Sequence, residues 1–202
     1  MKKPSLVYQF KITLLGVSPR VWRRIQVPAD YSFWDLHVAI QDSMGWLDSH
    51  VHAFFFERDG KRIEIGIPIE PPDDHPFYSG VTVKLSEYFT EPGLKSRYDY
   101  DFGDDWQHEV LNEGLLSRED GVKYPRCVDG LQPCPPEDCG GVEGYARLRR
   151  ILRNPKHKEY LETLQWMEGM ASLSRRAPFD ERNSGAVRFD NPRTRLRIAM
   201  SR

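Results

Sequence analysis

The chain has 202 residues, and its 39% hydrophobic and 12% aromatic content is enough for a packed core, which argues against a disordered protein. Its 29 basic and 30 acidic residues give a net charge of −1, a weaker indication of nucleic-acid binding than a basic chain would give. No apolar run is long enough for a membrane span and no signal-peptide core is present, so we expect a cytoplasmic protein with reduced cysteines and no membrane partner.

The N-terminal part predicts a β-hairpin followed by a helix. Apolar and polar residues alternate over residues 6–17, and residues 21–27 (VWRRIQV) form the returning strand. Ser32 and Asp35 have the spacing of a capping box, and apolar residues at helical spacing predict a helix over 33–44.

The next segment predicts short elements around an irregular loop. Strands are expected at 51–57 and 63–67, and the Pro- and Asp-rich stretch 66–80 should be an exposed loop. A short strand at 81–83 and one or two helical turns at 85–89 follow.

Two histidines near the third strand, His50 and His52, are two residues apart and fall on the same predicted strand face. Such a pair could share a metal ion. Histidines at a strand end near solvent are the commoner case, and we favour that interpretation.

A second, aromatic hairpin is predicted from residues 96–102 and 106–111, joined by the turn Gly-Asp-Asp. The alternation places Asp99 and Asp101 on its exposed face. The turn and the start of the next strand supply candidate binding residues: Asp101, Asp104, Asp105 and Trp106.

The segment 124–141, YPRCVDGLQPCPPEDCGG, holds all three cysteines and lies within a long stretch without periodicity. Loops longer than about 12–15 residues are usually functional or disordered. A structural zinc ion could order the segment, with these candidate ligands: Cys127, Cys134, Cys139 and His108. The alternative is that the thiols are reduced core filler. We interpret this segment and the acidic turn as two halves of one site.

The C-terminal part predicts two helices, 145–152 and 158–167, separated at Asn154-Pro155. Arg149 and Arg153 on the first are candidates for contacting phosphates, although a run of charge on a helix is usually a solvated face. Residues 171–202 carry eight Arg and three acidic residues, which predicts a basic tail, loosely docked or partly disordered, after a single domain over 1–170.

These elements together predict an α+β fold with a mainly antiparallel sheet. It starts with a β-hairpin and a helix in the order ββαβ, compatible with a grasp-like arrangement. The aromatic hairpin, two C-terminal helices and the irregular Cys/Pro-rich loop complete it.

Four motifs resemble the plasmid pRiA4b ORF-3-like family: YQFKITLLGVSPRVWRRIQVP, DLHVAIQDSMGW, YDYDFGDDWQHEV and YPRCVDGLQPCPPEDCGG. The resemblance covers residues 6–166, with the motifs in the same order. It implies a compact α+β domain in a mobile-element context but no established activity. Some members are labelled transposon resolvases. The chain has no serine- or tyrosine-recombinase constellation, so that label is not carried over.

Two functions are therefore open. The first is a binding domain for a protein or nucleic-acid partner. The alternative is a metal-dependent hydrolase or nuclease that uses the acidic turn 101–105. A nucleophilic cysteine paired with His108 is a third idea, but no spacing in the sequence orders those roles.

Overall fold

The computed structural model describes residues 5–67, 75–173 and 187–190. Its helices are α1 (Phe33–Met44), the 3₁₀ helix η1 (Leu85–Glu87), α2 (Gly141–Leu152) and α3 (Tyr160–Leu173). Its strands are β1 (Leu6–Leu14), β2 (Trp22–Pro28), β3 (His52–Arg58), β4 (Lys61–Gly66), β5 (Phe77–Ser79), β6 (Lys95–Tyr100), β7 (Trp106–Ser117) and β8 (Arg126–Leu131). The predicted α+β class is confirmed.

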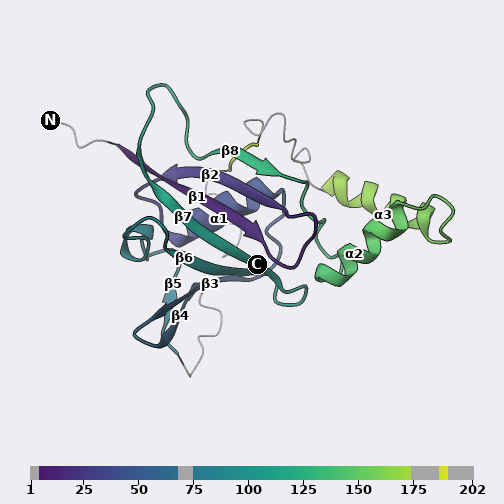
Figure 1. Ribbon diagram of the computed structural model, residues 1–202, viewed down its shortest axis with the longest axis horizontal. Coiled ribbons are helices and arrows are strands. Elements are labelled where there is room, and N and C mark those ends of the chain that lie inside the picture. The colour runs from purple at the N-terminus through teal and green to yellow at the C-terminus, as the bar shows by residue number, and fades with distance from the viewer. Residues whose placement is uncertain (1–4, 68–74, 174–186, 191–202) are drawn as a thin grey trace.

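The strands form one sheet in the order β5-β4-β3-β6-β7-β1-β2-β8 (Figure 1). Neighbouring strands run antiparallel, except that β5 is parallel to β4. The strands β6 and β7 separate β3 from β1. The opening ββαβ segment therefore spans most of the sheet and is not a block of adjacent strands.

Helix α1 packs against one face of the sheet. Its capping box is present, with the Ser32 hydroxyl accepting from the Asp35 backbone N–H and Gly45 ending the helix in a left-handed conformation. Leu36 and Ile40 are fully buried, and the Phe33 ring packs edge-on against rings of the sheet. Local capping signals and the apolar stripe thus fix both ends of α1.

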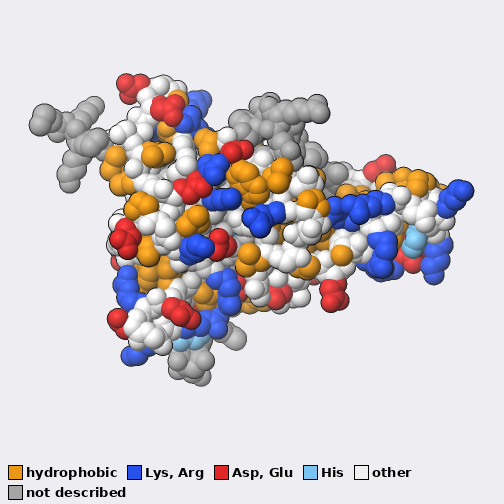
Figure 2. Space-filling model, in the orientation of Figure 1, with side chains coloured by type: hydrophobic (Ala, Val, Ile, Leu, Met, Phe, Trp, Pro, Cys, Tyr) orange, Lys and Arg blue, Asp and Glu red, His pale blue; other side chains and the backbone are white. Residues whose placement is uncertain are grey.

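No helix of the described residues covers the opposite face of the sheet. Trp22 lies there between Lys11 and Arg24, whose cationic groups are 4.8 and 5.2 Å from its ring. Arg24 also pairs with Glu113 at 2.6 Å. Basic and acidic side chains intermix over the sheet (Figure 2), so this face is a solvated surface of mixed charge.

A closed set of polar side chains lies between α1 and the sheet, and we call it the buried cluster: His37, Gln41, Asp48, His52 and Tyr98. His37 Nε2 is 2.7 Å from Asp48 Oδ1, and His37 Nδ1 is 2.8 Å from the Tyr98 hydroxyl. The His52 ring stacks on the His37 ring at 3.4 Å between centroids. These contacts satisfy both nitrogens of the His37 ring inside the core.

Buried Arg23 holds the middle of the Cys/Pro-rich segment against α1. Its Nε donates to the Ser43 carbonyl at 2.9 Å, and its Nη1 donates to the Gln132 carbonyl at 2.9 Å. β8 precedes this contact and pairs with β2. The segment is therefore tied to the sheet by a strand and by a buried guanidinium group.

Three strand assignments and the burial of two carboxylates differ from the sequence-based expectation. The segment 66–80 contains β5, whereas the strand expected at 81–83 is absent from the structure there. The segment expected to be irregular contains β8. Asp99 and Asp101, expected to be exposed, are buried.

Helices α2 and α3 form a hairpin that projects from one end of the sheet (Figure 1), and we call it the arm. No helix of the described residues is long and apolar enough to span a membrane. Of the predicted basic tail, 174–186 and 191–202 lie outside the described residues. Val187 and Phe189 pack against the core, and the Asp190 N–H donates to Asp42 at 2.6 Å.

Candidate functional site

The acidic turn and the Cys/Pro-rich segment meet at a close backbone junction. The Gly140 N–H donates to Asp104 Oδ2 at 3.1 Å. A Cβ atom on Gly141 would lie 2.4 Å from the Asp104 carbonyl oxygen, and Gly141 has a φ of +66°. Only glycine fits at this contact. The two segments that we interpreted as halves of one site therefore lie against each other.

Beside this junction three side chains converge, and we call them the open cluster: His50, Asp101 and Asp138. His50 Nε2 is 3.1 Å from Asp138 Oδ1 and 3.5 Å from Asp101 Oδ2. The three ligand atoms all lie within 4.8 Å of one another. His50 is half-buried, Asp101 is buried and Asp138 is exposed, so the cluster opens to solvent on one side.

The backbone conformation at Asp101 and Asp138 sets the direction of their carboxylates. Asp101 and Asp138 have φ values of 56° and 55°, in the left-handed region that aspartate tolerates better than most residues. Asp101 Oδ1 accepts from the Gly103 N–H at 3.0 Å and from the Asp104 N–H at 3.3 Å. Its other oxygen, Oδ2, is left to face His50.

The buried pair Tyr100 and Glu137 lies next to the open cluster and holds its loops in place. The Tyr100 hydroxyl donates to Glu137, and the Leu47 N–H donates to the same carboxylate at 3.0 Å. The Ser49 N–H donates to the Tyr100 hydroxyl at 3.0 Å. Desolvation by burial raises the pKa of Glu137. These bonds tie the loop that carries His50 to the segment that carries Asp138.

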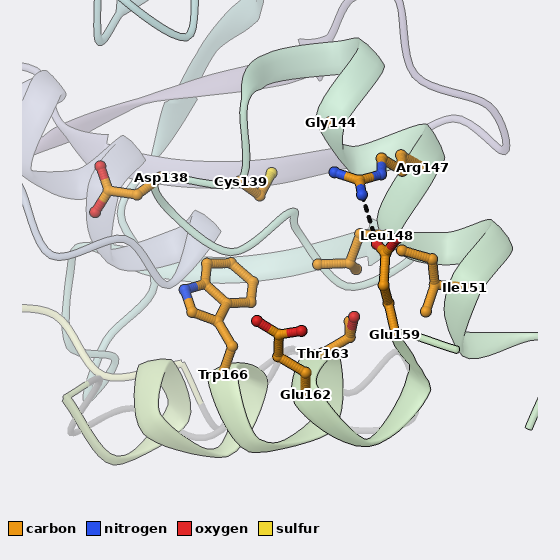
Figure 3. Close-up of a pocket in the computed structure, with 10 residues that line it drawn as sticks. All are labelled: Asp138, Cys139, Gly144, Arg147, Leu148, Ile151, Glu159, Glu162, Thr163 and Trp166. Carbon is orange, nitrogen blue, oxygen red and sulfur yellow. Dashed lines mark hydrogen bonds and ion pairs between the residues drawn. The ribbon is translucent and has the colours of Figure 1, made fainter. Parts of the chain in front are cut away.

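A cleft of about 530 Å³ opens between α2 and α3 and ends at Asp138 (Figure 3). Leu148 and Ile151 of α2 form an apolar wall, and Trp166 of α3 points into the cleft. Glu162 and Trp166, four residues apart on α3, lie on the same side of the helix. The cleft therefore combines an aromatic ring, an apolar wall and carboxylates.

Negative charge prevails among the side chains that line the cleft. Arg147 is paired with Glu159 across the hairpin. Asp138 and Glu162 then remain as carboxylates without a Lys or Arg partner among the ion pairs of the described residues. An isolated anionic group would be repelled from such a cleft, and a cationic group would be attracted.

The three cysteines and His108 of the expected zinc site do not converge. Cys127 Sγ lies 3.4 Å from the Asp129 carbonyl, Cys134 Sγ lies 3.3 Å from Met44 Sδ, and Cys139 lies just before α2. Within the described residues, the open cluster is the set found with three ligand atoms inside 4.8 Å. Structural zinc on the cysteines remains a prediction that this arrangement of side chains does not support.

Burial governs the chemistry of these four groups. Desolvation raises the pKa of Cys127 to about 11 and the pKa values of Cys134 and Cys139 to about 12. Desolvation also lowers the pKa of His108 to about 4. The thiols are therefore protonated near neutral pH, which disfavours the thiolate that a cysteine nucleophile requires.

The remaining candidates have separate surroundings. Trp106 is fully buried beside the Trp46 ring, so it cannot contact a partner at the surface. Asp105 accepts from the Gln107 side chain. Arg149 donates to the Ser18 carbonyl, whereas Arg153 at the end of α2 is exposed. The acidic turn thus contributes Asp101 to the open cluster, while Asp104 holds the Gly140 backbone and Asp105 contacts the nearby Gln107.

The sequence did not predict a site role for three residues of this region. His50 was considered only with His52, and Glu137 and Trp166 drew no functional interpretation. A usable signal was the adjacency of Glu137 and Asp138 to Cys139 in PPEDCGG, because acidic residues in a rigid Pro/Gly-rich loop are held in defined positions.

The comparisons with known proteins agree with this fold. The chain is 35% identical over 178 residues to the uncharacterized protein y4hQ of Sinorhizobium fredii, covering 88% of this chain and 89% of that protein. It is also similar to a crystal structure of the protein of unknown function MM3350 from Methanosarcina mazei Go1. That match has a TM-score of 0.75 and 38% identity, and covers 90% of this chain and 99% of the other. The plasmid pRiA4b ORF-3-like protein family matches residues 6–184, and the chain belongs to that family, whose relatives found here have no established activity.

Proposed function

We propose that this protein is a binding domain whose arm cleft takes a basic segment of a protein partner. The observation that carries the proposal is the side of α3 that faces the cleft, where the Trp166 ring lies beside the Glu162 carboxylate and Asp138 lines the end of the cleft (Figure 3). The occupant would be a short stretch with an Arg or Lys next to an apolar side chain.

Charge complementarity supports a cationic occupant. With Arg147 engaged by Glu159, the Glu162 carboxylate is available to a guanidinium or ammonium group, and Asp138, which contacts His50, adds negative charge at the end of the cleft. A cation over an indole ring gains about 0.5–1 kcal/mol at an exposed site and more where water is excluded. The neighbouring carboxylates add charge-assisted hydrogen bonds to the same group.

The apolar wall supports a peptide over a free ion. Leu148 and Ile151 are nearly buried by the hairpin itself, and the cleft exposes their remaining surface beside Trp166. A partner's aliphatic side chain would cover that surface while its basic neighbour meets the carboxylates. The cleft volume of about 530 Å³ lies in the range of pockets that bind small ligands or single anchoring side chains.

The same charges disfavour nucleic acid in the cleft. Phosphate groups would meet Asp138 and Glu162, and the Arg149 guanidinium group is held by the Ser18 carbonyl. Arg153 is exposed at the end of α2 but lies outside the cleft lining. A nucleic-acid partner would therefore have to use another surface.

The test is fluorescence anisotropy of the full chain with labelled short peptides that place Arg beside Leu. Matched peptides with Glu in place of Arg, and a DNA duplex, serve as competing probes. We expect the basic peptide to bind and its affinity to fall by about tenfold or more in Trp166→Ala, the loss of a buried aromatic anchor. Glu162→Gln should weaken binding less and reduce its salt dependence.

Leu161→Ala is the matched control, because Leu161 is on the same helix, is 72% exposed and is not part of the cleft lining. It should bind the basic peptide as the unchanged protein does. Equal affinity for the acidic peptide, or unchanged binding in Trp166→Ala, would reject the cleft as the binding site. DNA binding that competes with the peptide would reject the preference for protein.

A further inference from the structure

We infer that the open cluster, His50, Asp101 and Asp138, is a binding site for a divalent transition-metal ion of the zinc class. The three residues come from the loop before β3, the turn between β6 and β7, and the loop before α2. This inference does not depend on peptide binding by the cleft, and the two can be tested separately.

The spacing of the ligand atoms fits a metal ion. Zinc takes nitrogen and oxygen ligands at about 2.0–2.2 Å in a tetrahedral arrangement, which separates the ligand atoms from one another by about 3.3–3.6 Å. His50 Nε2 is 3.5 Å from Asp101 Oδ2 and 3.1 Å from Asp138 Oδ1. The Asp101 and Asp138 ligand atoms lie within 4.8 Å of each other, and the exposed Asp138 side chain has room to adjust to an ion.

The charge around the cluster supports a cation independently of its geometry. Asp101 and Asp138 both contact His50, and no ion pair of the described residues joins either carboxylate to a Lys or Arg. Asp104 and Glu137 bring two further carboxylates to the same junction. A divalent ion would offset much of the negative charge that the Asp carboxylates gather here.

One imidazole nitrogen and two carboxylate oxygens favour a transition-metal ion over calcium or magnesium. Imidazole nitrogen suits zinc, cobalt and other first-row ions, whereas calcium and magnesium prefer oxygen ligands alone. Three protein ligands leave at least one coordination position, and Asp138 also lines the arm cleft. That position would be open to water or to a ligand group, as in sites that keep an exchangeable position.

Asp101 is already oriented as a ligand. Its Oδ1 accepts from the Gly103 and Asp104 N–H groups, which leaves Oδ2 directed at the site. Such bonds around metal-binding carboxylates fix their direction and tune affinity. The contacts of Glu137 with Tyr100 and Leu47 hold the two loops that supply His50 and Asp138 at their present separation.

The experiment uses the full chain stripped with a chelator and titrated with Co²⁺ by absorption spectroscopy and with Zn²⁺ by calorimetry. We expect one equivalent to bind, with Mg²⁺ a poor competitor. His50→Ala and Asp138→Asn should each weaken binding by more than about tenfold, the loss already typical when a supporting residue is changed. Thermal unfolding of each variant without metal checks that it folds.

The double change Cys134→Ser and Cys139→Ser is the matched control. These residues lie near the junction but outside the open cluster, so Co²⁺ binding should be unchanged and its spectrum should lack thiolate charge-transfer bands. Thiolate bands that disappear in this variant would overturn the inference and favour a site on the cysteines. Absence of binding, or full binding in His50→Ala, would also overturn it.

Discussion

The buried cluster and the open cluster each contain a close His–Asp contact, but the first is shielded from solvent and the second is open to it. His37 contacts Asp48 at 2.7 Å in one, and His50 contacts Asp138 at 3.1 Å in the other. The His37 and Asp48 side chains are 0% and 9% exposed, whereas those of His50 and Asp138 are 30% and 61% exposed. The pairs come close in sequence, since Asp48 and His50 are two residues apart in one loop.

The difference shows that pairing and access, more than residue type, decide what such a cluster can do. Both ring nitrogens of His37 are occupied by protein groups, so its imidazole has no free ligand position. His50 directs one nitrogen at two carboxylates beside a cleft. The first arrangement stabilises the fold, and the second leaves atoms that an added ion or partner can use.

The largest expected contrast is in stability. His37→Ala removes a fully buried ring and leaves Asp48 and the Tyr98 hydroxyl with fewer partners, which should lower the free energy of unfolding by about 2–5 kcal/mol. His50→Ala, at a half-buried position, should change it by about 0.5 kcal/mol. Urea unfolding of metal-free protein measures both. Equal losses in the two variants would mean that the open cluster stabilises the fold as much as the buried cluster does.

A smaller effect concerns pH. Desolvation, followed by the neighbouring His37, lowers the pKa of His52 well below 6.5 in the folded protein. Below that pH the unfolded chain binds the proton and the folded chain does not, so His52 makes the free energy of unfolding fall as pH decreases. Stability should therefore drop between about pH 7 and pH 5, and less steeply in His52→Leu. Parallel profiles for the two proteins would contradict the shift.

Local signals explain what the sequence could predict about the fold. Helix α1 has the predicted bounds because its capping box, its apolar stripe and the terminal Gly45 are local signals, which do not depend on contacts with distant residues. β5 was not predicted because three residues in a Pro- and Asp-rich segment become a strand only by pairing with β4. β8 likewise depends on pairing with β2, across a register shift between Arg24 and Ile25.

The site was predicted in part, for a similar reason. The acidic turn and the Cys/Pro-rich segment were identified as partners, but alternation placed His50 on the face of His52 and Asp101 on an exposed face. β3 begins only at His52, so alternation does not extend to His50. β6 ends at Tyr100, and the left-handed φ of Asp101 turns its carboxylate inward. Strand periodicity fails at strand ends, where this site lies.

A substitution at the junction of Gly141 with Asp104 should affect the open cluster and not the buried cluster. In Gly141→Ala the new Cβ would meet the Asp104 carbonyl at 2.4 Å, and a left-handed φ of +66° disfavours alanine. The segment with Asp138 should then shift away from His50, at a cost of about 1–3 kcal/mol for the strained backbone. His50 ring resonances should move in NMR spectra, while those of His37 and His52 stay in place.

Gly169→Ala is the control for this change, because a Cβ there meets nothing within 4 Å and the residue is exposed within α3. Alanine should stabilise the helix by up to about 1 kcal/mol and leave every histidine resonance unchanged. If Gly141→Ala moved the His37 and His52 resonances as much as that of His50, the two clusters would respond as one unit. Movement confined to His50 would instead mean that the junction positions the open cluster alone, because the buried cluster is held by α1 and the central strands.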